Sequence, residues 1–215
     1  MSVQYAARSK LAALRLIDVL ALPHPNWLFT RAVGEVPERP WAQAYAGWTV
    51  RCAPSDRYAF CLPSRHQLDY ADVSAVVSHL LANAGVDCCV VYPSWRSRYS
   101  GNCLIGPEGT VVEAVAGEIA PLLRGRVTPD IVVTYASPDC LRSSVERGDV
   151  EDMGRPLLAR LAAVSRELTP VRGSLTLEWV STHAGGLLFY DSYGSGDVFG
   201  SRTRSGVRPP DRYRD

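Results

Sequence analysis

The sequence contains almost no lysine. Lys10 is the only one in 215 residues, against 22 arginines. Arginine recognises anions through a planar fork, whereas lysine is a compact point charge, so a single lysine is either incidental or required where arginine does not fit. Lys10 stands at the start of a predicted amphipathic helix, where a cation opposes the helix dipole unless an anion faces it. A solvated surface lysine and an anion-contacting lysine therefore both remain open.

Strong net charge and long apolar runs are also missing. A formal net charge of +1 provides no strong electrostatic attraction to nucleic acid or to an anionic membrane. No apolar stretch approaches the roughly 20 residues that a membrane span requires. The first residues, Met1-Ser-Val-Gln-Tyr5, lack the hydrophobic region of a signal peptide, so we expect a cytoplasmic protein. We expect neither a nucleic-acid nor a membrane partner, and the oligomeric state stays open.

The cysteines and histidines show no metal-binding spacing. Six cysteines are present, but no Cys-x-x-Cys pair occurs, and the four histidines have no ligand spacing relative to them. In a reducing compartment such cysteines are expected to be small buried hydrophobic residues. The pattern therefore argues against a zinc site.

Hydrophobic periodicity predicts an α+β chain with mostly antiparallel strand pairs. Helical spacing is found at residues 6–22, 70–84 and 154–168, with a short helical turn at 119–123. Two hairpins are predicted, one pairing residues 100–106 with 109–115 and the other pairing 174–180 with 186–191. Further strands are predicted at residues 47–52, 86–93 and 130–135. A tail at 201–215, rich in Gly, Ser, Arg, Pro and Asp, is predicted to be disordered.

The second hairpin carries two carboxylates, Glu178 and Asp191. If its turn centres on Ala184 and Gly185, paired residue numbers sum to 369, and Glu178 lies directly opposite Asp191. Opposed side chains share one face about 5 Å apart, where two like charges are destabilising unless a cation lies between them. Oxygen ligands of this kind suit Mg²⁺. A register that differs by one residue would instead send the two side chains to opposite faces.

Four short blocks, read in order, resemble the ATP-grasp nucleotide-binding domain of phosphoenolpyruvate synthase, pyruvate phosphate dikinase and rifampin phosphotransferase. The third block resembles that family most specifically, and together the blocks span about residues 6–193. The blocks are Ser9-Lys-Leu-Ala-Ala-Leu14 with Leu22-Pro-His-Pro25; Trp48-Thr-Val-Arg51; Val112-Glu-Ala-Val-Ala-Gly-Glu118 continuing to Gly125-Arg-Val-Thr-Pro-Asp130; and Leu177-Glu-Trp179 with the strand to Asp191.

The resemblance implies a role for each matched residue. It implies phosphate contacts from Lys10 and Arg51, with Arg51 stabilising charge on the transferred phosphoryl group. It implies that Glu178 binds metal and nucleotide, and Asp191 falls where the family usually has glutamine. The remaining nucleotide contacts implied by the resemblance are Val91 and Tyr92, in a hinge strand that meets adenine, and Glu118. The implied cofactors are ATP and Mg²⁺.

The resemblance also implies a two-lobed ATP-grasp-like fold, with a mainly antiparallel sheet in the C-terminal lobe. The expected divisions are an N-terminal lobe at residues 1–89, a C-terminal lobe at 90–200 and the tail at 201–215. The expected activity is phosphoryl transfer to a small-molecule acceptor or to a separate phosphohistidine protein. Two alternatives stay open: a carboxylate–amine ligase acting through an acyl phosphate, and a non-catalytic nucleotide- or partner-binding module.

Two departures from the family pattern motivate the non-catalytic alternative. Tyr193 replaces the family's terminal arginine, and the segment at residues 56–65, which matches the phosphate-covering loop, has no glycine. A loop without glycine cannot bring its backbone as close to phosphate.

Overall fold

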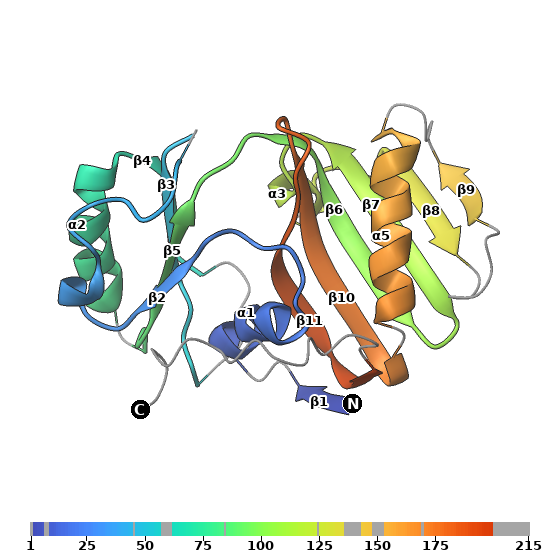
Figure 1. Cartoon of the computed structure of the whole chain (residues 1–215), viewed down its shortest axis with the longest axis horizontal. Coiled ribbons are helices and arrows are strands. Elements are labelled where there is room, and N and C mark those ends of the chain that lie inside the picture. Colours follow the sequence, from blue (N-terminus) through green and yellow to red (C-terminus); the bar gives the residue numbers. More distant parts are fainter. Residues whose placement is uncertain are drawn as a thin grey trace.

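A computed structural model of the chain describes residues 2–6, 9–44, 46–56, 62–83, 85–123, 125–135, 143–147, 153–168 and 170–199. Its elements form two antiparallel sheets with helices packed against them, arranged as two lobes side by side (Figure 1). This confirms the predicted α+β, two-lobed fold class. The predicted tail at residues 201–215 lies outside the described residues.

The larger sheet has seven strands in the order β1-β11-β10-β6-β7-β8-β9. Both predicted hairpins lie in it, and each is longer than predicted. The strands are β1 (Ser2–Ala6), β6 (Ser97–Gly106), β7 (Gly109–Ala116), β8 (Ile131–Tyr135), β9 (Ser143–Arg147), β10 (Pro170–Thr182) and β11 (Leu187–Phe199). The short helix α3 (Ala120–Leu123) follows β7.

Helix α5 (Arg155–Glu167) covers one face of the larger sheet (Figure 1). It buries Leu157, Leu158 and Leu161 in one cluster with Leu175 and Leu177 of β10. Side chains alternate between the two faces of a strand, so the residues between these leucines point to the face away from α5. That second face carries Glu178.

The smaller sheet has four strands in the order β2-β5-β3-β4, and helix α2 (Tyr70–Leu81) packs on it. Its strands are β2 (Leu28–Thr30), β3 (Trp48–Cys52), β4 (Ser64–Leu68) and β5 (Cys89–Pro93). A 3₁₀ turn, η1 (Val33–Glu35), follows β2. Val73, Val77 and Leu80 of α2 are fully buried against Val50 and Val91 of the sheet. The predicted helix at 70–84 is therefore confirmed to within a turn.

Helix α1 (Lys10–Val19) is shorter at its start than the periodicity predicts. The Ser9 hydroxyl accepts a hydrogen bond from the amide of Ala12 at 3.1 Å, which caps the helix and fixes Lys10 as its first residue. At the other end Ala21 has a positive φ of 53°, and the amide of Leu22 donates to the carbonyl of Ile17 at 3.1 Å. This is a Schellman cap with alanine at the position that favours glycine.

The sheets do not follow the predicted boundary between residues 89 and 90. β1 pairs with β11 in the larger sheet, and α1 contacts β11. β5 crosses the boundary and lies in the smaller sheet, between β2 and β3. Along the chain, β1 therefore belongs to the larger sheet, β2 to β5 form the smaller sheet, and β6 to β11 belong to the larger sheet again. Hydrophobic patterning reports which face of an element is buried, but not which distant edge a short strand joins.

Strand β11 continues to Phe199, well beyond residue 191, where the predicted hairpin strand ends. Gly194 has a φ of 124°, and a Cβ atom there would lie 2.1 Å from the carbonyl oxygen of Ser174. The glycine is thus needed for strand pairing and does not end the strand. Within the part of the chain that the structure describes, no helix has the length and apolar character to cross a bilayer.

Candidate functional site

A β-bulge places Glu178 opposite Asp191. The pairs from Ser174 to Glu178 follow the predicted sum of 369, but nearer the turn the pairing shifts by one, and Trp179 faces Phe189. Tyr190 is the extra residue of this bulge. If the pairing nearer the turn continued along the strand without a bulge, Asp191 would face Leu177. The predicted pairing is therefore confirmed, although the turn that produces it differs from the assumed one.

Two cations from distant segments meet the Asp191 carboxylate. Lys10, at the start of α1, forms an ion pair with Oδ2 of Asp191, and Arg51 of β3 donates to the same oxygen at 3.1 Å. Oδ1 accepts the backbone N–H of Ser192 at 2.9 Å. The side chains of Lys10 and Asp191 are only 3% and 2% exposed, and that of Arg51 is 22% exposed. The single lysine thus faces an anion, but in this structure the anion belongs to the protein.

Burial and neighbouring charges shift several pKa values here. Burial, with Arg51 as a second cause, holds the pKa of Lys10 well below its usual value, and Glu178 opposes this. Burial lowers the pKa of Arg51, but Tyr92 and Glu178 more than offset it. Burial and Glu178 raise the pKa of Tyr190 well above its usual value. Lys10, Arg51, Tyr92, Glu178 and Tyr190 therefore lie close enough for their charges to interact, and they come from α1 and from both sheets.

The row of polar residues continues across the larger sheet. Asn102 of β6 is the register partner of Glu178 on one side and of Glu113 of β7 on the other. Its Nδ2 donates to Oε2 of Glu113 at 3.3 Å, whereas its buried Oδ1 has no hydrogen-bond partner. The strands β6 and β7 approach closely because residue 101 is glycine. A Cβ atom there would lie 1.8 Å from the carbonyl oxygen of Glu113.

The residues expected to contact adenine occupy different environments. Val91 is fully buried and pairs with Leu28 on one side and Val50 on the other, so its backbone lies inside the smaller sheet. The structure therefore gives no free strand edge at Val91 for a base, because both edges are used in pairing. Tyr92, also buried, stacks on Trp95 with ring centroids 5.4 Å apart.

Glu118 lies just beyond β7 and is exposed. Its Oε1 accepts a hydrogen bond from the Ser97 hydroxyl at 2.8 Å. Its charge contributes to the raised pKa of both Tyr92 and Tyr190, although burial is the larger cause for each. The charge of Glu118 thus acts on Tyr92 and Tyr190.

The expected phosphate-covering loop is described only in part. Residues 57–61 lie outside the described chain. Beyond them, His66 of β4 contacts Ser64 through Nε2 at 2.8 Å and Thr49 through Nδ1 at 3.2 Å, and Thr49 in turn bonds Ser94 at 2.7 Å. Burial and Arg51 lower the pKa of His66. A neutral imidazole is therefore favoured beside Arg51.

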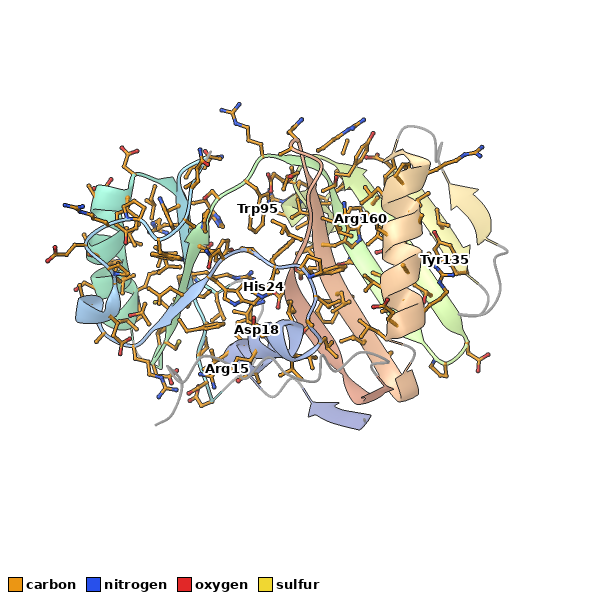
Figure 2. The ribbon with its side chains drawn as sticks, viewed as in Figure 1. Arg15, Asp18, His24, Trp95, Tyr135 and Arg160 are labelled. Carbon is orange, nitrogen blue, oxygen red and sulfur yellow. The ribbon has the colours of Figure 1, made fainter. Side chains whose placement is uncertain are left out.

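A second pair of charges lies between the lobes, where Asp18 and His24 are close together in Figure 2. Oδ1 of Asp18 lies 3.0 Å from Nε2 of His24 and also accepts from Nε1 of Trp27 at 3.2 Å. Although burial lowers the pKa of His24, its bonds to Asp18 and to the carbonyl of Pro25 raise it overall. This group is partly exposed and fixes the end of α1 to the following segment.

The side chains offer a limited set of metal ligands. Among the described residues, no group of three or more His, Cys, Asp and Glu side chains is arranged to hold a metal ion. The four described cysteines form no disulfide with one another and are buried, as expected: Cys52, Cys88, Cys89 and Cys103. Mg²⁺ commonly takes one or two protein oxygens plus substrate phosphates, so the oxygen-lined face at Glu178 fits this ion and not zinc.

Comparison with known proteins gives structural matches only. No family model matches the sequence. No curated protein matches it. Solved structures that are similar include an ADP complex of PurK, N5-carboxyaminoimidazole ribonucleotide synthetase (TM-score 0.49, 9% identity, covering 86% of this chain and 44% of that one). Two others are the VanG D-Ala:D-Ser ligase of Enterococcus faecalis (0.49, 12%, 86% and 51%) and the ATP-grasp ligase PsnB (0.40, 14%, 86% and 52%).

The chain spans about half the length of these three structures. With TM-scores below 0.5 and identities of 14% or less, the likeness carries no residue role over to this chain. The resemblance to the phosphoenolpyruvate synthase family stays a prediction from the sequence blocks. The geometry at Lys10, Arg51, Glu178 and Asp191 has to carry any functional argument.

Sequence reasoning overlooked Asn102 and Tyr190. A signal for Asn102 was present, because a two-residue turn between Gly106 and Gly109 places Asn102 opposite Glu113. Its position beside Glu178 had no local signal, because β6 and β10 are far apart in sequence. Tyr190 was not predicted because a bulge cannot be distinguished from a regular strand by alternation alone.

Proposed function

We propose that this chain binds ATP with Mg²⁺ where its two sheets meet and transfers the γ-phosphoryl group to an oxygen atom of a small acceptor. The observation that supports this is the meeting of Lys10 and Arg51 with Glu178 and Asp191. Two cations from one side and two carboxylates from the other gather at one buried point from four separate elements.

This arrangement suits phosphoryl transfer. The reaction requires neutralisation of phosphate charge and in-line positioning, with little covalent chemistry from the protein. Lys10 and Arg51 would supply positive charge to the phosphates, and Glu178 would hold the metal ion. Mg²⁺, when bound, would neutralise phosphate oxygens from the opposite side. Because Lys10, Glu178 and Asp191 are all buried, nucleotide binding requires the sheets to separate here, so that phosphate can reach Lys10 and Arg51 beside Asp191.

We further propose a carboxylate as the acceptor. Lys10 and Arg51 together already hold a carboxylate, that of Asp191, in a largely buried site. The same two cations would allow an anionic acceptor to approach an anionic phosphate, which a neutral hydroxyl does not require. The product would be an acyl phosphate, and attack by an amine would complete a ligase reaction. A hydroxyl acceptor and a partner protein's histidine are the competing possibilities.

A thermal-shift series tests nucleotide binding. A ligand that binds only the folded state stabilises it by mass action and so raises Tm. At a ligand concentration of a hundred times Kd, the free energy of unfolding increases by about 2.7 kcal/mol. We expect ATP with Mg²⁺ to raise Tm, and expect a much smaller shift in Glu178→Gln. Glu108→Gln, in the exposed turn between β6 and β7, is the matched control and should behave as the wild type. No shift at millimolar MgATP in the wild type would refute the proposal.

Product analysis identifies the acceptor. Hydroxylamine traps an acyl phosphate as a hydroxamate, so a panel of carboxylic acids is incubated with MgATP and hydroxylamine. Hydroxamate formed together with ADP supports the carboxylate acceptor. ADP formed with a phosphorylated alcohol, or an acid-labile phosphoprotein, would instead support the competing acceptors.

The buried ion pairs favour one second candidate, a non-catalytic module. If Lys10 and Arg51 serve only to neutralise Asp191, the cluster joins the two sheets and binds no nucleotide. A wild type that shows no nucleotide response, while Asp191→Ala strongly lowers Tm, would support this candidate.

A further inference from the structure

We propose that the divalent cation is held between the carboxylate of Glu178 and the side-chain carbonyl oxygen of Asn102, while Asp191 remains with Lys10 and Arg51. This inference rests on the proposed function for the nucleotide that accompanies the metal. It replaces the expected ligand pair of Glu178 and Asp191 with a pair from adjacent strands β10 and β6.

Strand register brings the two proposed ligands together. Glu178 and Asn102 are direct partners in the pairing of β10 with β6. Directly opposed side chains share a face with their Cβ atoms about 5 Å apart, a separation that two oxygen ligands of one small ion can span. Glu178 is 4% exposed, so an ion there would be largely shielded from solvent.

The Asn102 amide is oriented by its other neighbour. Nδ2 donates to Oε2 of Glu113 at 3.3 Å, on the β7 side. Nδ2 and Oδ1 diverge from the same carbon, so with Nδ2 on the β7 side we infer that Oδ1 lies on the side of β10 and Glu178. The reverse orientation would bring two acceptors, Oδ1 and the Glu113 carboxylate, against each other. Glu113 thus holds the carbonyl in the position that a metal ion requires.

The unpaired oxygen is the observation that points to a ligand. Oδ1 of Asn102 is buried without a hydrogen-bond partner, which is uncommon for a buried polar atom. Asn102 is also the register partner of Glu178, whose carboxylate provides a second oxygen acceptor on the same face. A hard cation that prefers oxygen ligands satisfies both.

Asp191 is poorly available for the same ion. Its Oδ2 is occupied by Lys10 and Arg51, and its Oδ1 by the amide of Ser192. A metal ion at Asp191 would have to displace one of the two cations and would lie next to the other. Holding Lys10 and Arg51 in place is therefore the role that its contacts support.

Mn²⁺ binding in the presence of ADP, followed by electron paramagnetic resonance, tests the assignment without any turnover. We expect Asn102→Leu and Glu178→Gln each to weaken Mn²⁺ binding about tenfold or more. Asn102→Asp, which adds a charged oxygen, should bind Mn²⁺ at least as tightly as the wild type. Asn26→Leu, at an exposed asparagine, is the matched control and should have no effect.

Asn102→Cys provides a second measurement that survives if Asn102→Leu fails to fold. A thiolate ligand favours soft ions, so this variant should gain Cd²⁺ affinity over the wild type and show thiolate-to-cadmium ultraviolet absorption. Asn26→Cys should show neither change.

The outcomes separate the inference from the proposed function. A wild type that binds no Mn²⁺ with ADP overturns both. Normal Mn²⁺ binding in folded Asn102→Leu, with loss in Glu178→Gln, overturns the inference alone and returns the metal to Glu178 with another partner. Loss in both variants, with Cd²⁺ gained by Asn102→Cys, supports it.

Discussion

Removing the Asp191 carboxylate should destabilise the protein, and the loss should depend on pH through Lys10. Asp191 neutralises two cations, of which Lys10 is buried and cannot turn to solvent. Removing one partner of a buried ion pair costs about 3–5 kcal/mol. With a urea slope of about 2.5 kcal/mol/M, a loss of 4 kcal/mol lowers the unfolding midpoint by roughly 1.5 M. We expect this for Asp191→Ala at pH 7, and little change for Asp56→Ala, which removes an exposed carboxylate.

The sign of the pH dependence follows from Lys10. Without Asp191, burial and Arg51 still lower the pKa of Lys10 in the folded state, and its value in the unfolded chain is the ordinary 10.5. The unfolded state then binds the extra proton, so the stability of Asp191→Ala should rise with pH between 7 and 10, by at most about 1.4 kcal/mol per pH unit. Urea unfolding at pH 7, 8 and 9 measures this slope.

The double variant Lys10→Met/Asp191→Ala completes the test. It leaves no buried unpaired lysine, so it should lose the pH slope and be more stable than the sum of the two single losses predicts, by roughly 1–3 kcal/mol. Lys10→Met alone should cost less than Asp191→Ala, because Arg51 and the Ser192 amide still satisfy the carboxylate. Additive losses within about 0.5 kcal/mol, or a flat pH profile for Asp191→Ala, would refute the reasoning.

Three further predictions concern other parts of the molecule. Ala21→Gly should stabilise the protein by about 1 kcal/mol in thermal or urea unfolding, because glycine adopts the positive φ of the α1 cap without strain; an unchanged or lower Tm would contradict this. Gly101→Ala should lower Tm strongly, because its Cβ atom would collide with the Glu113 carbonyl, and a wild-type Tm would show that β6 and β7 are not so close. The His24–Asp18 pair should add about 0.2–1 kcal/mol below pH 6.5, which is lost as pH rises through the raised pKa of His24; Asp18→Asn should remove this dependence, measured by urea unfolding from pH 5 to 9.

Local patterns in the sequence identified the elements but not their arrangement. The helical spacing at 70–84 and the turn between Gly106 and Gly109 were sufficient to predict α2 and the β6–β7 hairpin, because both depend on neighbouring residues. The pairing of β1 with β11 joins residues nearly 200 positions apart and left no local signal. The same limit hid the contact between the neighbouring strands of Glu178 and Asn102.

The sequence predicted which residues form the candidate site better than it predicted the contacts between them. The unusual single lysine and the two carboxylates of the last hairpin indicated charged residues with a common purpose. That Lys10 and Arg51 would both bind Asp191 depends on how α1 and β3 pack against β11, which no spacing within one segment encodes. That Val91 pairs with a strand on each side was not predictable either, because a buried apolar run looks the same for a central strand and for a hinge.

The return of the chain to its first sheet has a consequence for folding during synthesis. The strands and helix of the smaller sheet lie within residues 28–93, so this unit contains its own partners and can assemble early. Helix α1 and strand β1 are made well before their partners on β11. Lys10 must therefore wait, exposed to solvent, until Asp191 has left the ribosome, and contacts of such long sequence separation close slowly. The charged site is consequently among the last features to form, and a truncated nascent chain can hold a folded smaller sheet with no site beside it.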